Sequence, residues 1–368
     1  MLLAFLLLGC VPAPTRSDSA EPAGDSSPPD DTAPPDTDPA VPLDCSSIIG
    51  SGSIAIASRA DPGTLLTVAP PLSGEQAATS LAGPDSLGRY YLVEPTGIVR
   101  RSNDGGCSWN AVGTLPGYSA TGSDTAGNPD YAVFDLFTAP TANGVYAYGP
   151  SQLLVSEDGA HWDELTAPVL RSPALLGIDP ADPDRLRGYG PDGIVTSTDG
   201  GASWTTTSVP DADAWYNAAI DGADIDRVAL SARGLWVASD GVTWVQRDPE
   251  LQAALAWDSG VLYSMCRDPD DARLRIRRST DAGVSFVDLP VDTDPYASVS
   301  RLAADRDLVV SGGYRYVSSE DVTGLIQFTT DAGTIVHPVD GFNGVKGVAF
   351  GADRVLIAFE GPDIWQND

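Results

Sequence analysis

The chain has 368 residues, with 21 Lys and Arg against 51 Asp and Glu, and a formal net charge of −30 at pH 7. So acidic a chain has no basic stripe to neutralise phosphates, which excludes nucleic acid as a partner. The presence of only two histidines, His161 and His337, and the lack of a closely spaced cysteine pair argue against a zinc site.

The first ten residues, MLLAFLLLGC, form an apolar stretch that is too short to span a bilayer. They resemble the signal peptide of a bacterial lipoprotein, which implies that Cys10 carries the lipid. Two features depart from that pattern: no Lys or Arg precedes the apolar stretch, and Leu8 is bulkier than the usual small residue. A truncated ordinary signal peptide is the alternative. Val11 stands where inner-membrane lipoproteins carry aspartate, so we expect a lipid-anchored, extracytoplasmic protein at the outer membrane or cell surface.

Residues 11–44 hold nine prolines, eight acidic residues and one arginine. Such a segment cannot bury a core and favours extended conformations, so it is typical of a disordered, self-repelling tether. We therefore expect three parts: a signal peptide over 1–10, the tether over 11–44 and a folded domain over 45–368.

One motif recurs through the folded domain: an aspartate, a glycine one or two residues later, and then a large apolar residue. Successive motif aspartates are separated by 43, 54, 41, 41, 41 and 50 residues, which is the spacing of propeller blades with about four short strands each. The seven aspartates are Asp61, Asp104, Asp158, Asp199, Asp240, Asp281 and Asp331.

The residue types of the motif suit a tight turn. A carboxylate there accepts hydrogen bonds from the backbone N–H groups just ahead of it, and glycine adopts the positive φ that the turn needs. The large apolar residue then closes the end of the hairpin. We interpret these aspartates as structural rather than catalytic or metal-binding. The apolar position is Trp109, Trp162, Trp204 or Trp244 in four motifs, and Phe286, Val336 or Leu66 in the others.

The strands between the motifs are short and joined by Gly, Asp and Pro, which favours antiparallel sheets over βαβ units. No convincing helical stretch is present. Six sets of strands run from about residue 75 to 340, after which 344–350 and 354–359 supply only two strands. Residues 52–58 and 64–69 can complete that blade. The prediction is an all-β, seven-bladed β-propeller of four-stranded antiparallel blades, with the last blade closed by strands from both termini.

The run IDPADPDRL followed by GIVTSTDGGASW resembles the Asp-box, or BNR, repeat. Sialidases, the sortilin ectodomain, some cellulose- and xyloglucan-cleaving enzymes and the photosystem II assembly lipoproteins share this repeat. The resemblance covers nearly all of residues 45–368. It is specific for the fold and weak for the function, because catalytic and non-catalytic propellers carry the same turn.

The resemblance implies what each family would require. Sialidases grip the substrate with three arginines, and the first lies in a Phe-Arg-Ile-Pro-like motif that is missing here. Arg100 and Arg101 lead straight into a box and cannot replace it, while nothing in the spacing of Arg233, Arg301 and Arg315 demands that they converge. The polysaccharide hydrolases use two propellers, and the assembly lipoproteins use a basic patch, whereas this chain has one propeller and one lysine.

Ligands of propellers usually bind at the face opposite the boxes, where the loops between second and third strands and between blades gather. Exposed aromatic residues in such loops are typical of carbohydrate or protein contacts, although each can instead pack under its own loop. The candidates are Tyr118, Trp215, Tyr216, Tyr296, Tyr314, Arg315, Tyr316 and Glu320.

Three cysteines follow Cys10, so an exported chain is expected to hold one disulfide and one remaining thiol. We favour Cys45 with Cys107, whose blades should be neighbours in the closed ring, and this leaves Cys266. No cofactor is expected. Two acidic clusters offer oxygens to calcium, but similar turns recur in propellers without metal; the clusters are Asp179, Asp182 and Asp184, and Asp268, Asp270 and Asp271.

The sequence thus favours a membrane-tethered, monomeric propeller that acts as a non-catalytic binding or scaffold module for a protein or glycan. The alternative is a glycoside hydrolase of sialidase-like fold with a non-standard site. The sequence does not name the ligand.

Overall fold

The computed structural model describes Cys45 and residues 54–360, apart from 63–64, 69–79, 95, 118–121, 124–128, 131–133, 140, 150–151, 171–174, 211–214, 250–251, 253, 268–273, 291–296, 317–321 and 340–343. The described residues contain β-strands and no α-helix, as the sequence predicts. The predicted signal peptide and tether lie outside them. No helix among them is both long and apolar enough to cross a membrane.

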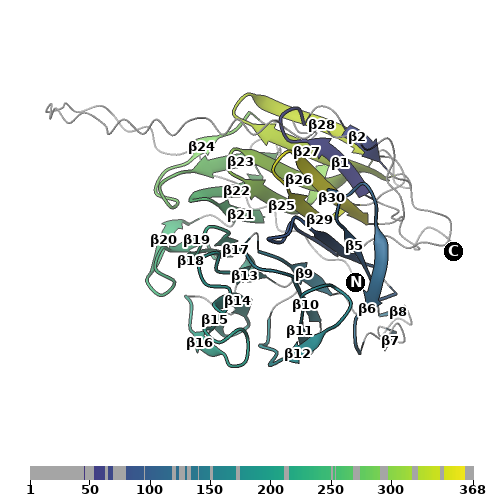
Figure 1. Ribbon diagram of the computed structural model, residues 1–368. Coiled ribbons are helices and arrows are strands. Elements are labelled where there is room, and N and C mark those ends of the chain that lie inside the picture. Colours follow the sequence, from purple (N-terminus) through teal and green to yellow (C-terminus); the bar gives the residue numbers. More distant parts are fainter. Residues whose placement is uncertain are drawn as a thin grey trace, which may run out of the picture.

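Seven four-stranded antiparallel sheets form the ring of the propeller (Figure 1). We number them as blades 1 to 7. In blades 1 to 6 the chain runs from the innermost strand to the outermost strand. Blade 1 consists of β3 (Ser80–Ala82), β4 (Tyr90–Val93), β5 (Ile98–Ser102) and β6 (Asn110–Thr114). Blade 2 consists of β9 (Asp135–Phe137), β10 (Val145–Gly149), β11 (Gln152–Ser156) and β12 (Asp163–Leu165). Blade 3 consists of β13 (Leu176–Ile178), β14 (Leu186–Gly190), β15 (Gly193–Ser197) and β16 (Thr205–Thr207).

The second strand of blade 4 and the first three strands of blade 6 have nine residues each. In blade 4 the turn between the first two strands is short, because Asp221 pairs with Asp224. Blade 4 consists of β17 (Trp215–Asp221), β18 (Asp224–Ala232), β19 (Leu235–Ala238) and β20 (Trp244–Asp248). Blade 5 consists of β21 (Ala254–Asp258), β22 (Val261–Arg267), β23 (Leu274–Ser279) and β24 (Val287–Asp288). Blade 6 consists of β25 (Ala297–Asp305), β26 (Leu308–Tyr316), β27 (Val322–Thr330) and β28 (Gly333–Val339).

Blade 7 closes the ring with strands from both ends of the described chain, which confirms the predicted closure. Its order is β29 (Gly344–Phe350), β30 (Arg354–Glu360), β1 (Ile54–Ser58) and β2 (Leu65–Val68). β1 pairs with β30 over five residues, from Ile54 opposite Ala358 to Ser58 opposite Arg354. One further hairpin, β7 (Gly122–Ser123) with β8 (Pro129–Asp130), lies in the connection between blades 1 and 2.

The core lies between the blades rather than in one centre. Alternate residues of each strand point to opposite faces of its sheet, so each blade packs one apolar layer on each neighbour. Between blades 6 and 7, for example, Phe328 packs in one buried cluster with Ile357 and Phe359. Between blades 7 and 1, Ile56 and Leu92 belong to the next such cluster. The short, apolar strands read from the sequence therefore form a ring that each blade helps to stabilise.

Candidate functional site

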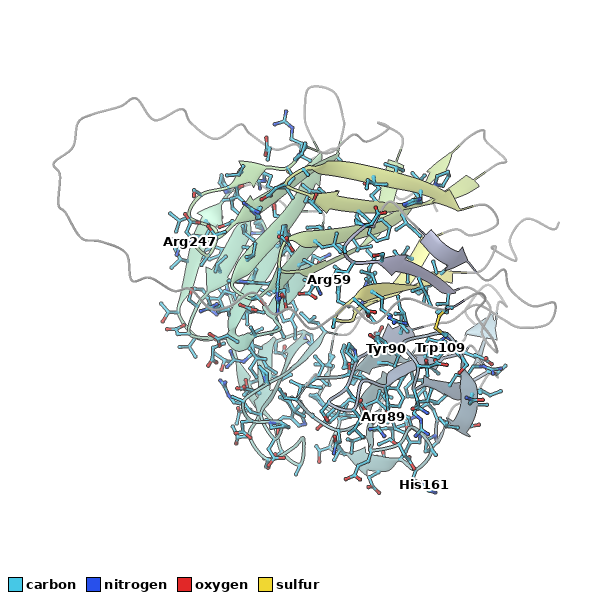
Figure 2. The ribbon with its side chains drawn as sticks, turned by 45° about the horizontal axis from the view of Figure 1, so that its top comes forward. Arg59, Arg89, Tyr90, Trp109, His161 and Arg247 are labelled. Carbon is cyan, nitrogen blue, oxygen red and sulfur yellow. A yellow bond between two sulfur atoms is a disulfide. The ribbon has the colours of Figure 1, made fainter. Side chains whose placement is uncertain are left out.

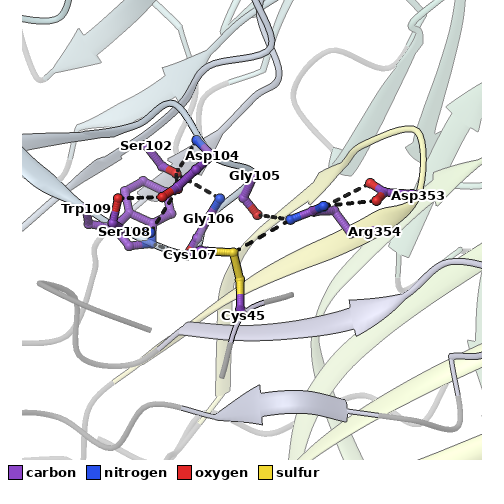
Figure 3. The surroundings of a disulfide bond; sticks show 10 residues. All are labelled: Cys45, Ser102, Asp104, Gly105, Gly106, Cys107, Ser108, Trp109, Asp353 and Arg354. Atoms are coloured by element: carbon purple, nitrogen blue, oxygen red, sulfur yellow. Dashed lines mark hydrogen bonds and ion pairs between the residues drawn. A yellow bond between two sulfur atoms is a disulfide. The ribbon is translucent and has the colours of Figure 1, made fainter. Parts of the chain in front are cut away.

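The recurring aspartate motif forms a turn, called a box from here on, and it is best seen in full at Asp104, between β5 and β6 (Figure 3). Its Oδ1 accepts the N–H of Ser108 at 2.9 Å and its Oδ2 accepts the Ser108 hydroxyl at 2.6 Å. The buried hydroxyl of Ser102 donates to Asp104 Oδ1 at 2.8 Å and accepts the N–H of Gly106 at 2.8 Å. Gly106 has φ +94°, a conformation that side chains resist. The carboxylate and the serine therefore lock the turn together.

The boxes at Asp199 and Asp281 repeat this geometry. In each, the carboxylate accepts a backbone N–H at 2.9 Å and a hydroxyl at 2.6 Å, from Ser203 and Ser285 respectively. These hydroxyls and N–H groups lower the pKa of Asp199 and that of Asp281 to about 2. Sequence reasoning missed the serine two residues before the aspartate, although its recurrence was visible: Ser102, Ser156, Ser197 and Ser279.

In the boxes at Asp158 and Asp240, which are one residue shorter, the carboxylate also accepts hydrogen bonds from its own turn. Asp158 Oδ1 accepts the N–H groups of Ala160 at 2.8 Å and of His161 at 2.9 Å, and the N–H of His161 is the main cause of its lowered pKa. Asp240 accepts the N–H of Thr243 at 2.6 Å. The hydroxyl and N–H of Thr243 lower the pKa of Asp240 to about 2. His161 is thus a turn residue.

Three of the four box tryptophans donate their indole N–H to the glycine carbonyl three residues earlier. Trp109, buried with 2 % of its surface exposed, does so at 2.9 Å, and Trp162 and Trp204 do so at 3.2 Å. The Nε1 of Trp244 is buried and has no hydrogen-bond partner among the described residues. The tryptophans thus close the ends of the hairpins.

The motif at Asp331 does not show this carboxylate geometry, and that at Asp61 is described only in part. Asp331 lies in a two-residue hairpin, with Thr330 opposite Gly333, so the turn is too short to fold back on the carboxylate. Both oxygens of Asp331 instead accept Arg278 Nη1 at 2.7 Å. At Asp61 the backbone N–H donates to Ser58 Oγ at 3.2 Å, and the two residues that follow Pro62 lie outside the described part.

A second set of aspartates joins neighbouring blades through the turns between first and second strands. Asp85 Oδ2 accepts the N–H of Gly144 in blade 2 at 3.2 Å. Asp258 Oδ2 accepts the N–H of Arg306 in blade 6 at 3.0 Å. Sequence reasoning missed this role, because each partner belongs to the next repeat.

Blade 6 is joined to blade 7 by the same kind of acid, this time through an arginine side chain. The carboxylate of Asp305 forms an ion pair with Arg59, which is labelled in Figure 2. The guanidinium of Arg59 also donates to the carbonyl of Gly351 at 3.2 Å. A sequence signal for these acids exists, since an aspartate ends or directly follows the first strand of four blades: Asp179, Asp221, Asp258 and Asp305.

The sulfur atoms of Cys45 and Cys107 are joined, with their Cα atoms 5.4 Å apart (Figure 3). The bond ties the segment before β1 to the box turn of blade 1. Arg354 of blade 7 reaches the same turn and donates to the carbonyl of Gly105 at 3.1 Å. Cys266 is buried, and no cysteine among the described residues is free, so the expected remaining thiol is wrong.

The acidic clusters considered for calcium serve turns where they are described. Asp179 accepts the N–H of Ala181 at 2.9 Å and pairs with Arg185 at 2.9 Å, while Asp182 accepts the N–H of Asp184 at 3.3 Å. The described ranges hold no group of three or more His, Cys, Asp or Glu that would suit a metal ion. Asp268, Asp270 and Asp271 lie outside those ranges.

The residues predicted for the ligand face are described only in part. Tyr118, Tyr296 and Glu320 lie outside the described residues. Trp215 and Tyr216 begin β17, and Tyr314, Arg315 and Tyr316 end β26, but only the backbone of these five is described. Because strands run antiparallel, the start of a first strand and the end of a second strand lie at the end of the blade away from the boxes.

The arginines weighed against a sialidase site are not brought together by any contact in the described structure. Arg100 forms an ion pair with Glu94, and Arg101 donates to the carbonyl of Asp158 at 2.8 Å, which fixes blade 1 to the box of blade 2. Arg233 lies in the turn after β18, with φ 28°, and Arg301 lies in β25.

A pocket of about 470 Å³ opens between the turns of blades 1 and 2, where Arg89 and His161 lie (Figure 2). Small-molecule sites are lined mainly by apolar groups, whereas this lining is mostly charged. Arg89 is already paired with Asp85 at 2.6 Å, and Asp158 with His161 at 2.9 Å. The pocket is therefore a polar gap between two blades and lacks the apolar lining of a typical small-molecule site. The lining residues are Leu87, Arg89, Asn143, Glu157, Asp158, His161 and Asp163.

No protein-family model and no curated protein matches this sequence. Solved structures do share its fold. A GH74 xyloglucanase from Xanthomonas campestris is 16 % identical over 78 % of this chain and 51 % of that chain, with a TM-score of 0.58. This chain thus spans about half of the xyloglucanase.

Two YCF48 structures are matched over almost their whole length. YCF48 from Cyanidioschyzon merolae is 16 % identical over 83 % of this chain and 98 % of that chain, with a TM-score of 0.51. A structure of YCF48 bound to D1 peptide is 13 % identical over 86 % and 96 % of the two chains, with a TM-score of 0.53. At these identities the likeness establishes the propeller class and nothing finer.

Proposed function

We propose that this chain is a non-catalytic propeller that binds or scaffolds a protein partner. The observation that carries the proposal is the use of its turn carboxylates. A glycosidase needs one protonated carboxyl group and one carboxylate directed at the substrate. Of the five box aspartates described above, each accepts hydrogen bonds from its own turn, and in each the pKa is lowered, which suits no general acid.

Among the described carboxyl groups Asp258 is the strongest candidate for an acid, because burial raises its pKa. Its Oδ2, however, accepts the N–H of Arg306, and the neighbouring Asp221 is fully buried and accepts the N–H of Gly260 at 2.9 Å. Both carboxylates are thus occupied between blades. A protein partner is favoured over a polysaccharide by the extent of the structural likeness, which covers nearly the whole of YCF48, seen with a bound peptide, but about half of the xyloglucanase.

The decisive experiment assays the purified chain on xyloglucan, on a panel of chromogenic glycosides and on a glycan array. We expect no turnover and no saturable glycan binding. Turnover that Asp258→Asn abolishes would overturn the proposal in favour of a hydrolase. Retained turnover in Asp192→Asn, an exposed acid in the turn between β14 and β15, is the matched control.

The lipid anchor and the extracytoplasmic location are part of the proposal. They rest on the sequence of residues 1–44, from the apolar stretch ending in Cys10 to the acidic, proline-rich tether. A lipid thioether and a disulfide cannot share one sulfur atom. Peptide mapping without reduction therefore tests the anchor: a diacylglyceryl-modified Cys10 supports it, and a Cys10–Cys266 cross-link overturns it.

A further inference from the structure

The outer edge of blade 6 differs from the other outer edges of the propeller. Its last strand, β28, has seven residues, whereas the outer strands of the other blades have two to five. β28 pairs with β27 along its whole length without a register shift. In the described structure no strand pairs with its other side. A long, regular and open edge is a template for another strand.

The chemistry of β28 leaves this edge unprotected. Natural edges are blunted by charged residues, bulges or short length, yet the sequence GTIVHPV has no Lys, Arg, Asp or Glu. The only residue of β28 that protects an edge is Pro338, next to the end of the strand. Ile335 and Val336 remain 39 % and 38 % exposed. Because successive side chains alternate, one of them lies on each face of the sheet, and an added strand would contact both.

The strand is also held in place. Thr334 Oγ1 donates to the carbonyl of Pro290 in blade 5 at 2.8 Å. His337 Nε2 lies 3.1 Å from the carbonyl of Pro62 in blade 7. These contacts fix β28 from both neighbouring blades through side chains and do not use the backbone of its open edge. A preformed edge loses little conformational freedom on binding, which favours affinity.

The added strand could come from a second copy of this chain or from a partner protein, and charge favours the partner protein. A second copy would bring one chain of net charge −30 against another, which opposes self-association at this edge. An extended segment with basic flanks gains from the same field. We propose that β28 docks an extended segment of a partner protein, with β-branched apolar residues at its centre and Lys or Arg on either side. The inference rests on the proposed binding function and assigns it a place.

The test uses a fluorescent probe peptide, Lys-Lys-Thr-Val-Ile-Val-Thr-Lys-Lys, titrated with the full chain while its anisotropy is followed. We expect saturable binding that Val336→Lys weakens by about tenfold, through lost apolar contact and repulsion of the probe. The control is Val169→Lys, the same change at a valine that is 68 % exposed in the connection between blades 2 and 3, and it should bind like the wild type. A probe with Glu in place of each Lys should bind at least about tenfold more weakly.

A second variant guards against misfolding. Ile335→Thr keeps a β-branched side chain, should melt like the wild type, and should also weaken binding. Absence of binding by the folded wild type, or equal binding by both probes, would overturn the assignment. So would a wild-type dimer in sedimentation that Val336→Lys dissociates, since a second copy would then occupy the edge. Failure of these tests leaves the glycoside assays unaffected, so the two proposals fail separately.

Discussion

Asp221, at the end of the first strand of blade 4, accepts the N–H of Gly260 in blade 5 at 2.9 Å. The same carboxylate accepts the N–H of Ala223 in its own turn at 3.0 Å and pairs with Arg227 at 3.2 Å. One buried side chain thus joins two blades whose turns are separated by about one repeat of the sequence. Such bonds supply directional links between sheets that otherwise meet through apolar side chains.

We expect Asp221→Ala to lower the free energy of unfolding by about 1–3 kcal/mol, because two backbone N–H groups lose their acceptor. Equilibrium urea unfolding followed by tryptophan fluorescence measures the change. Asp192→Ala, in an exposed turn, should change stability by less than about 0.5 kcal/mol. Equal stability of the two variants would show that Asp221 is not an interblade link.

Asp258 should show the opposite dependence on pH from a box aspartate. Burial raises its pKa, so its contribution to stability is complete below the unfolded pKa of about 3.9 and is lost as pH rises through the folded value. Asn removes the buried charge and keeps an acceptor for the N–H of Arg306. Asp258→Asn should therefore be more stable than the wild type at pH 7, with the difference shrinking toward pH 4. Urea midpoints at both pH values measure this, and a less stable variant at pH 7 would contradict it.

Much of the fold follows from local sequence, and the links between blades do not. The box recurs because its carboxylate, serine and glycine lie within five residues, so a single repeat shows the device. Blade closure is also predictable, because strands 344–350 and 354–359 lack two partners that residues 52–58 and 64–69 supply. The backbone N–H that Asp221 or Asp258 accepts lies in the next repeat, and no local sequence pattern predicts that contact. Asp331 shares the motif but not the geometry, because its hairpin is too short.

Asp281 tests the pH dependence of a box. Bonds from Ser285 lower its folded pKa to about 2, so its contribution is present above the unfolded pKa of about 3.9 and is lost as pH falls toward 2. Asp281→Asn removes the titrating group. The variant should be less stable than the wild type at pH 7 and should lose less stability between pH 4 and pH 2. Thermal melts across this range measure the slope, with Asp192→Asn expected to keep the wild-type slope.

The Cys45–Cys107 bond should stabilise the closed ring by restricting the unfolded chain. The two residues are 62 positions apart in the sequence. Removing a disulfide that closes a loop of that size typically lowers the free energy of unfolding by about 2–4 kcal/mol. Cys45→Ser and Cys107→Ser should each lower the free energy of unfolding by this amount. The double variant should lose no more than either single variant, because both changes remove the same bond. Urea unfolding of the three variants measures the losses, and additive losses would show that the two cysteines stabilise the protein separately.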